Sequence, residues 1–143
     1  MALVLRRIEH GSADYLAAVA LRRRVLRTPL GLDFTAEQLA AEIGDDLLAA
    51  FEDGHVAGTL VLTPHENALK LRQMAVAPEL GGQGIGARLI AFAEAVARDE
   101  GFKQIVLHAR VSAQGFYEKS GYRAEGEIFT EVTLPHIAMA KTL

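Results

Sequence analysis

The sequence predicts an α+β fold whose sheet is mostly antiparallel and includes one parallel strand–helix–strand crossover. The 143 residues are half hydrophobic and 23% charged, which suits a single packed domain over residues 1–143. The tight-turn pair Asp53-Gly54 separates two apolar runs and predicts a hairpin. A glycine-rich stretch after Pro78 leads from an apolar strand into a helix, and so predicts the crossover.

Two helices are expected in the first third of the chain. Ser12 can cap a helix that runs to about Arg27. Thr35 opens a second helix, with Gln38 as its capping-box partner and Gly44 at its end. The apolar face of the first helix is expected to comprise Leu16, Val19, Ala20 and Leu26.

Strands and two further helices complete the expected order of elements. The strands are expected at residues 2–8, 47–51, 56–63, 68–77, 105–109, 122–133 and 136–141. The long helix after the glycines has apolar residues at helical spacing from Ile85 to Val96 and stops at Gly101. Ser112 is expected to cap a short helix through Lys119, with Gly121 at its C-terminal end.

Composition argues against several classes of function. With 15 Lys and Arg against 18 Asp and Glu, the net charge of -3 disfavours a general nucleic-acid binder. The chain has no cysteine for a disulfide, a thiolate metal site or a nucleophile, and its five histidines lack ligand spacing, so no metal is expected. No apolar run approaches the roughly 20 residues of a membrane span. A cytoplasmic protein without membrane contact is expected.

The glycines at positions 81, 82, 84 and 86 are the most informative feature. They let the backbone approach a ligand closely, and the helix start offers free N–H groups to an anion. The alternative is a tight turn that holds no ligand. A P-loop is disfavoured because no lysine and hydroxyl follow Gly86. The match to a dinucleotide pattern is weak, because the next strand ends in residues 108–110, His-Ala-Arg, without an acidic residue.

Two motifs at a characteristic separation extend this interpretation. Residues 76–79, Val-Ala-Pro-Glu, and the glycine segment 82–89 are similar to a family's Arg/Gln-x-x-Gly-x-Gly/Ala motif between a strand and a long helix. Residues 113–122 resemble its Asn-x-x-Ala-x-x-x-Tyr-Glu-Lys-x-Gly-Phe motif. The family is the GNAT superfamily of acetyl-CoA-dependent N-acetyltransferases. The resemblance implies a mixed sheet of about six or seven strands with helices on both faces. The ending 135–139 is similar to the ElaA-type branch.

The resemblance also implies a binding site for acetyl-CoA as cosubstrate. The backbone of Met74, Ala75 and Val76 would pair with the pantetheine arm, and the N–H of Val76 would hydrogen-bond the thioester oxygen. The pyrophosphate would bind at Gly81, Gly82, Gln83, Gly84, Ile85, Gly86 and Ala87.

Two residues depart from the family pattern. Gly81 replaces the usual Arg or Gln and removes one side chain near the pyrophosphate. Arg110 replaces an Asn and leaves three readings open: it pairs with a cofactor phosphate, pairs with a substrate carboxylate, or lies in solvent.

The resemblance assigns Tyr117 as the general acid for the departing thiolate, against the alternative of an aromatic packed beside Phe116. The general base is less defined, because Arg72 and Gln73 stand where many members have a carboxylate. His108 and His136 are the candidates, ahead of Glu42, Glu127 and Glu131. The run Arg22-Arg23-Arg24 is expected on a solvated surface rather than against an acidic substrate.

The sequence therefore predicts an N-acetyltransferase that acts on a primary amine of a small molecule or peptide. A non-catalytic acyl-CoA-binding or sensing module is the alternative from another class, and a nucleotide-binding regulatory domain is a third. Homodimers are common in the family, and a homodimer is compatible with this chain.

Overall fold

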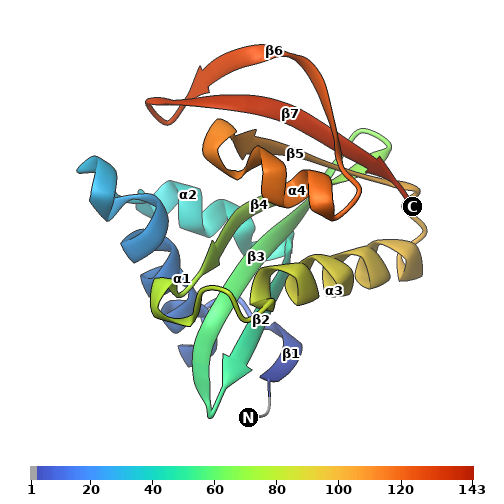
Figure 1. Ribbon diagram of the computed structural model, residues 1–143. Coiled ribbons are helices and arrows are strands. Elements are labelled where there is room, and N and C mark those ends of the chain that lie inside the picture. Colours follow the sequence, from blue (N-terminus) through green and yellow to red (C-terminus); the bar gives the residue numbers. More distant parts are fainter. Residues whose placement is uncertain (1–2) are drawn as a thin grey trace.

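Seven strands form one sheet in the computed structural model, which describes residues 3–143 (Figure 1). The strand order is β1-β2-β3-β4-β5-β7-β6, and every neighbouring pair is antiparallel except β4 and β5. The strands are β1 (Leu3–Ile8), β2 (Asp46–Glu52), β3 (His55–His65), β4 (Ala68–Val76), β5 (Gln104–Arg110), β6 (Arg123–Glu131) and β7 (Leu134–Thr142). The predicted hairpin and parallel crossover are both present. Residue 2, the expected start of the first strand, lies outside the described residues.

The structure has four α-helices, and two of the three predicted N-terminal side-chain caps are confirmed. The helices are α1 (Ala13–Leu26), α2 (Ala36–Ala40), α3 (Ile85–Asp99) and α4 (Gln114–Lys119). The Ser12 hydroxyl accepts a hydrogen bond from the N–H of Tyr15, which caps α1. Thr35 and Gln38 form the reciprocal capping box of α2, at 3.1 and 2.9 Å. A 3₁₀ turn at Ala41–Gly44 continues α2 to its predicted end.

Helices cover both faces of the sheet, as predicted (Figure 1). On one face α3 packs through Leu89 and Ala93 on the central strands, and Gly58 of β3 allows this close approach. A Cβ at position 58 would lie 2.7 Å from Cδ1 of Leu89. On the other face α1 packs through Ala18 and Val19. The α+β class is confirmed. Within residues 3–143, no helix is both long enough and apolar enough to cross a bilayer.

The predicted apolar face of α1 is wrong in part. Leu16 is 65% exposed and Ala20 is exposed as well. The side chains that α1 buries are Tyr15, Ala18, Val19, Leu21 and Arg22. The buried face of α1 differs from the predicted one because it includes a charged residue, Arg22, whose partner comes from another segment.

The predicted cap of the short helix is also wrong. Ser112 lies inside a 3₁₀ turn, Val111–Ala113, and α4 begins at Gln114 without a side-chain cap. The 3₁₀ turn takes the place of the cap because it continues directly from the end of β5 into α4. The predicted end of α4 at Lys119 is confirmed.

Candidate active site

The strands β4 and β5 separate at the point where the chemistry-bearing residues begin. They pair only from Leu69–Ile105 to Leu71–Leu107, although β4 continues to Val76 and β5 to Arg110. A cavity of about 440 Å³ lies where they part. Its lining comprises residues 70–74 and 107–110, Leu26, Arg27, Gln38, Ala113, Tyr117, Glu131, Val132 and His136. The volume is in the range of small-molecule sites.

A β-bulge shapes the β4 side of this cavity. The register with β3 passes from Val61–Arg72 to Thr59–Ala75, so Gln73 and Met74 together face a single β3 residue. Gln73 has a φ of 55°, which is rare outside glycine. Its side-chain Oε1 is buried and has no hydrogen-bond partner among the described residues. The bulge therefore presents an unpaired acceptor at the cavity.

The end of β4 offers a backbone donor toward the gap. Ala77 donates its N–H to the carbonyl of Ala57 at 2.9 Å. Successive N–H groups of an antiparallel strand point to opposite sides, so the N–H of Val76 points away from β3 and toward β5. Since the β4–β5 ladder has already ended at Leu71, no strand of the described part of the chain pairs with this N–H. Ala75, between Met74 and Val76, packs its side chain in the core.

The glycine loop, residues 81–87, follows the 3₁₀ turn Pro78–Leu80 after β4 and includes the first residues of α3. Gly82 and Gly84 have φ values of 80° and 77°, and a Cβ at either position would meet no atom within 4 Å. Gly84 is the N-cap of α3 and has no side chain that could bond to the helix start. The first helical hydrogen bond runs from the N–H of Arg88 to the carbonyl of Gly84. The N–H groups of the preceding helical residues, 85–87, therefore have no helical acceptor. Gly81 and Gln83 are exposed beside them.

Two residues of the loop point inward instead. Ile85 is buried in the core, so only its backbone faces the loop. A Cβ at Gly86 would lie 2.9 Å from Phe116 and 3.1 Å from Met74, so this glycine makes room for their side chains. Ala87 is exposed in the first turn of α3. The loop therefore has free backbone N–H groups at residues 85–87, while the side chains of Ile85, Phe116 and Met74 pack on its inner side.

Tyr117 of α4 lies against the bulge of β4. Its hydroxyl is 3.7 Å from the Met74 sulfur, its ring packs edge-on to Phe116 at 5.2 Å, and the residue is 9% exposed. Burial raises the pKa of Tyr117 to about 12. The side chain therefore lines the cavity as a protonated hydroxyl and also packs beside Phe116.

Two histidines meet one carboxylate across three strands. His108 of β5 is 2.9 Å, through Nδ1, from Oε1 of Glu131 on β6. His136 of β7 is 5% exposed; its Nδ1 lies 2.9 Å from the carbonyl of Leu134, and its Nε2 lies 3.8 Å from Oε2 of Glu131. A carbonyl only accepts, so Nδ1 of His136 carries the proton in the neutral ring and Nε2 is free to accept one. All three residues line the cavity.

Arg110, at the end of β5, lies inside the cavity wall and not in open solvent. Its Nη2 donates to the carbonyl of Leu26 at 3.0 Å, and the residue is half-buried. It is directly across from His136 in the β5–β7 register. Burial lowers the pKa of its guanidinium.

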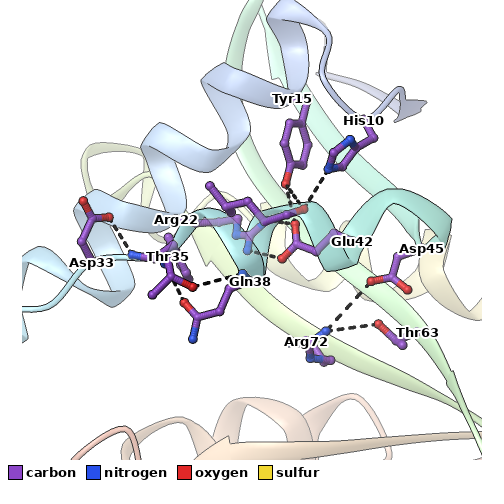
Figure 2. Close-up of polar contacts among 12 residues, drawn as sticks. His10, Tyr15, Arg22, Asp33, Thr35, Gln38, Glu42, Asp45, Thr63 and Arg72 are labelled. Carbon is purple, nitrogen blue, oxygen red and sulfur yellow. Dashed lines mark hydrogen bonds and ion pairs between the residues drawn. The ribbon is translucent and has the colours of Figure 1, made fainter.

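The expected surface position of Arg22 is wrong, and Glu42 is not at the cavity. Arg22 is 1% exposed and donates to both oxygens of Glu42, at 2.8 and 2.6 Å, while Tyr15 donates to the same carboxylate at 2.8 Å (Figure 2). The other two arginines of the run, Arg23 and Arg24, are on the surface as predicted, paired with acidic side chains. Because its carboxylate is fully bound, Glu42 serves the packing of α1.

Several cavity residues carried no signal in the sequence that placed them at the site. Arg27 follows the last residue of α1, Gln38 lies within α2, and Lys70 and Gln73 come from β4. Their side-chain types are common on surfaces, and only the bulge and the parting of β4 from β5 bring them together. Within residues 3–143, no group of three His, Asp or Glu side chains is arranged to hold a metal ion.

Comparison with known proteins finds a family model that matches most of the chain. Residues 26–143 match the family model described as an acetyltransferase (GNAT) domain. The human protein N-acetyltransferase 8B is 32% identical over 116 residues, which cover 75% of this chain and 50% of that protein. The chain spans about half the length of the curated relatives it matches.

Solved structures share the whole fold. A proposed N-acetyltransferase from Lactobacillus plantarum is 25% identical, with a TM-score of 0.87 over 100% of this chain and 99% of that one. ElaA from Escherichia coli has a TM-score of 0.80 at 19% identity, over 98% of this chain and 99% of that one. The second likeness shows the shared fold, and membership of the ElaA-type branch stays a prediction.

Proposed function

The chain belongs to the GNAT acetyltransferase family, and we propose that it transfers the acetyl group of acetyl-CoA directly to a primary amine of a small molecule or peptide. The observation that carries this proposal is the parting of β4 and β5, with a free N–H at Val76 of β4 and the Tyr117 hydroxyl 3.7 Å from Met74 of the same strand. An open strand edge beside a glycine-rich helix start can hold an extended arm that ends in a pyrophosphate.

The glycine loop has the properties that the pyrophosphate of acetyl-CoA requires. The N–H groups of residues 85–87 lack acceptors, and the space above Gly82 and Gly84 is open. Neither glycine could be replaced without strain, because both have positive φ. An aminoglycoside 6'-N-acetyltransferase of the same fold was solved with coenzyme A. The site thus fits the group through its backbone, although the usual side chain at position 81 is absent.

Groups of this chain would then fill three roles in the reaction. Bound acetyl-CoA supplies a thioester, whose C–S bond breaks as the amine forms a C–N bond to the same carbon. The Val76 N–H stabilises negative charge on the carbonyl oxygen. Tyr117 donates its hydrogen bond, and finally its proton, to the leaving sulfur. His136 or His108 accepts the proton from the amine, directly or through water.

Glu131 lies against both candidate histidines and links them. Its carboxylate lies 2.9 Å from Nδ1 of His108 and 3.8 Å from Nε2 of His136, so one side chain positions both rings. An amine is mostly protonated near neutral pH and must lose a proton before it attacks. A pair of histidines beside one carboxylate, within the same cavity, is suited to take that proton.

The test is a screen of amines and peptides for thiol release that depends on acetyl-CoA. The expected result is release with a subset of amines, accompanied by an acetylated product of matching mass, and loss of both in Gly84→Asp. If the protein binds acetyl-CoA and releases no thiol with any amine or peptide, it is an acyl-CoA-binding module and the proposal fails.

A further inference from the structure

The cavity between β4 and β5 is cationic in a protein whose net charge is -3. Four permanent cations line it, Arg27, Lys70, Arg72 and Arg110, against the single carboxylate of Glu131. That carboxylate is already bonded to His108 at 2.9 Å. Arg72 has partners of its own, Thr63 at 3.4 Å and Asp45 at 4.0 Å.

Arg27 and Arg110 converge on one oxygen atom. Nη1 of Arg27 and Nη2 of Arg110 donate to the carbonyl of Leu26, at 3.1 and 3.0 Å, where α1 ends. Among the described residues neither guanidinium has a carboxylate within 4.0 Å. Arg27 is held further by the ring of Phe34, 4.5 Å away. Two like charges are thus fixed side by side, and the carboxylate of Glu131 acts on Arg27 only from beyond ion-pair distance.

The energetic cost of this arrangement is visible in both arginines. Burial, and then the charges of Arg110 and Arg22, lower the pKa of Arg27, while burial lowers that of Arg110. Desolvated guanidinium groups are unfavourable unless an anion completes them. Each still has N–H donors beyond the one used at Leu26, in the fork geometry that matches a carboxylate or phosphate.

We propose that the acceptor amine carries an oxyanion, a carboxylate or a phosphate, which binds between Arg27 and Arg110. This inference rests on the proposed function. The cavity lining contains no residue of the glycine loop, so this pair is separate from the expected pyrophosphate site. Arg110 is the direct cross-strand neighbour of His136. An acceptor held by its anion at Arg110 would therefore place an amine a few bonds away beside the histidines.

The chemical test compares amines that differ only in the anion. The carboxylate arm pairs β-alanine and the common α-amino acids with their amides, and the phosphate arm pairs phosphoethanolamine with ethanolamine. In one arm the anionic amine should have a kcat/KM at least about tenfold above its neutral partner. Arg27→Gln and Arg110→Gln should each lower that value about 10- to 100-fold, mainly through KM, with acetyl-CoA affinity retained. Arg98→Gln, an exposed charge in the last turn of α3, is the matched control.

A binding measurement separates this inference from the acetyl-transfer proposal. Acetate and inorganic phosphate are titrated into the free protein while the arginine Nε–Hε signals are followed by NMR. At least one anion should shift the signals of Arg27 and Arg110 saturably and leave Arg98 unchanged. Equal response of all three arginines, or equal turnover of anionic and neutral amines, overturns the inference. Absence of turnover with every amine, together with saturable binding at Arg27 and Arg110, contradicts acetyl transfer and leaves the anion site standing.

Discussion

Arg22 and Glu42 form a buried, bidentate ion pair that fixes the segment after α2 against α1 (Figure 2). Arg22 Nη1 and Nη2 lie 2.8 and 2.6 Å from the two carboxylate oxygens, and the guanidinium also lies over the ring of Phe34 at 4.7 Å. Since α2 carries Gln38 to the cavity wall, this pair supports one side of the candidate site.

Breaking this pair should destabilise the protein strongly. Glu42→Gln leaves the Arg22 charge buried without its counterion, and we expect the free energy of unfolding to fall by about 3–5 kcal/mol. Urea denaturation measures the change. The exposed pair Arg23–Asp33 is the control, and Asp33→Asn should lower the free energy of unfolding far less, because water screens an exposed ion pair. An apolar double variant, Arg22→Met with Glu42→Leu, should recover much of the loss. Equal effects of Glu42→Gln and Asp33→Asn would contradict the role of burial.

The same pair should make stability depend on acid pH. Burial acts to raise the pKa of Glu42, but the hydrogen bonds and charge of Arg22 outweigh it, and the pKa lies below its ordinary 4.5. A carboxyl whose pKa falls on folding stabilises the protein above the unfolded-state value and loses that effect as pH falls through the folded-state value. The stabilisation from Glu42 should therefore be complete above about pH 5.5 and decline below 4.5. Urea titrations across this range should show a shallower decline in Glu42→Gln.

Acetyl-CoA affinity should depend on Gly84. Gly84→Asp puts a side chain and a negative charge into the open space above the loop, in a backbone conformation that disfavours it. We expect the dissociation constant for acetyl-CoA, measured by calorimetry, to rise at least about tenfold. Gly101→Asp is matched, because Gly101 has a φ of 87°, meets open space and follows the other end of α3. If both variants bind acetyl-CoA as tightly as the native protein, the glycines serve only the turn.

Turnover should fall in Tyr117→Phe while acetyl-CoA affinity is kept. The pKa of Tyr117 is about 12, well above that of an ordinary thiol near about 8.5, so a hydrogen bond to the thiolate is favoured over early proton transfer. The loss in kcat should therefore be at the low end of the roughly 10²–10⁴-fold range for acid catalysis. Because the native hydroxyl stays protonated, it should add no loss of activity on the alkaline side below about pH 11. Unchanged kcat in a chemistry-limited assay would leave Tyr117 a packing residue.

Local signals in the sequence predicted most of the fold. The caps at Ser12 and Thr35, the turn at Asp53-Gly54 and the glycines before α3 each act within a few residues, so one window contains their whole cause. The burial of Arg22 has a distant cause, since Glu42 lies 20 residues away. A run of arginines reads as surface unless such a partner is known.

The turn between β6 and β7 has residue types that do not predict its backbone conformation. Val132 and Thr133 both adopt positive φ, 48° and 63°, although β-branched residues disfavour that region. The pairing of β6 with β7 imposes this conformation, and the last paired residues are Glu131 and Leu134. As a result Val132 lies at the cavity, at a position that no local pattern singled out, beside Glu131, which the sequence offered only as a weaker candidate base.

The parts of the candidate site that lie within one short motif could be predicted from the sequence. The parts in which side chains from distant segments meet could not. The glycine loop and Tyr117 are in or beside recognisable segments. The meeting of Arg27 with Arg110 joins the end of α1 to the end of β5, 83 residues on by their numbers, and needs the sheet to exist first. The same is true of His108, Glu131 and His136, which come from three strands.

The last prediction concerns the proton that leaves the amine. Only a neutral imidazole can accept it, so kcat/KM should fall on the acidic side of the pH profile as the responsible histidine becomes charged. His136→Gln or His108→Gln should remove that acidic decline and lower kcat/KM by about 10²–10⁴-fold. Glu131→Gln should also lower kcat/KM, because the carboxylate that lies against both imidazole rings is lost.

The histidine at position 55 provides the control, because it is exposed on β3 and does not line the cavity. His55→Gln should keep both the profile and the rate. Of the two candidates, His136 is the more buried, and its Nε2 is free because Nδ1 is bound at the Leu134 carbonyl. The larger loss is therefore expected in His136→Gln. If the single variants and the double variant of His108 and His136 all keep the native profile and rate, no histidine removes the proton. The acceptor would then be an amine that is already largely neutral at the working pH.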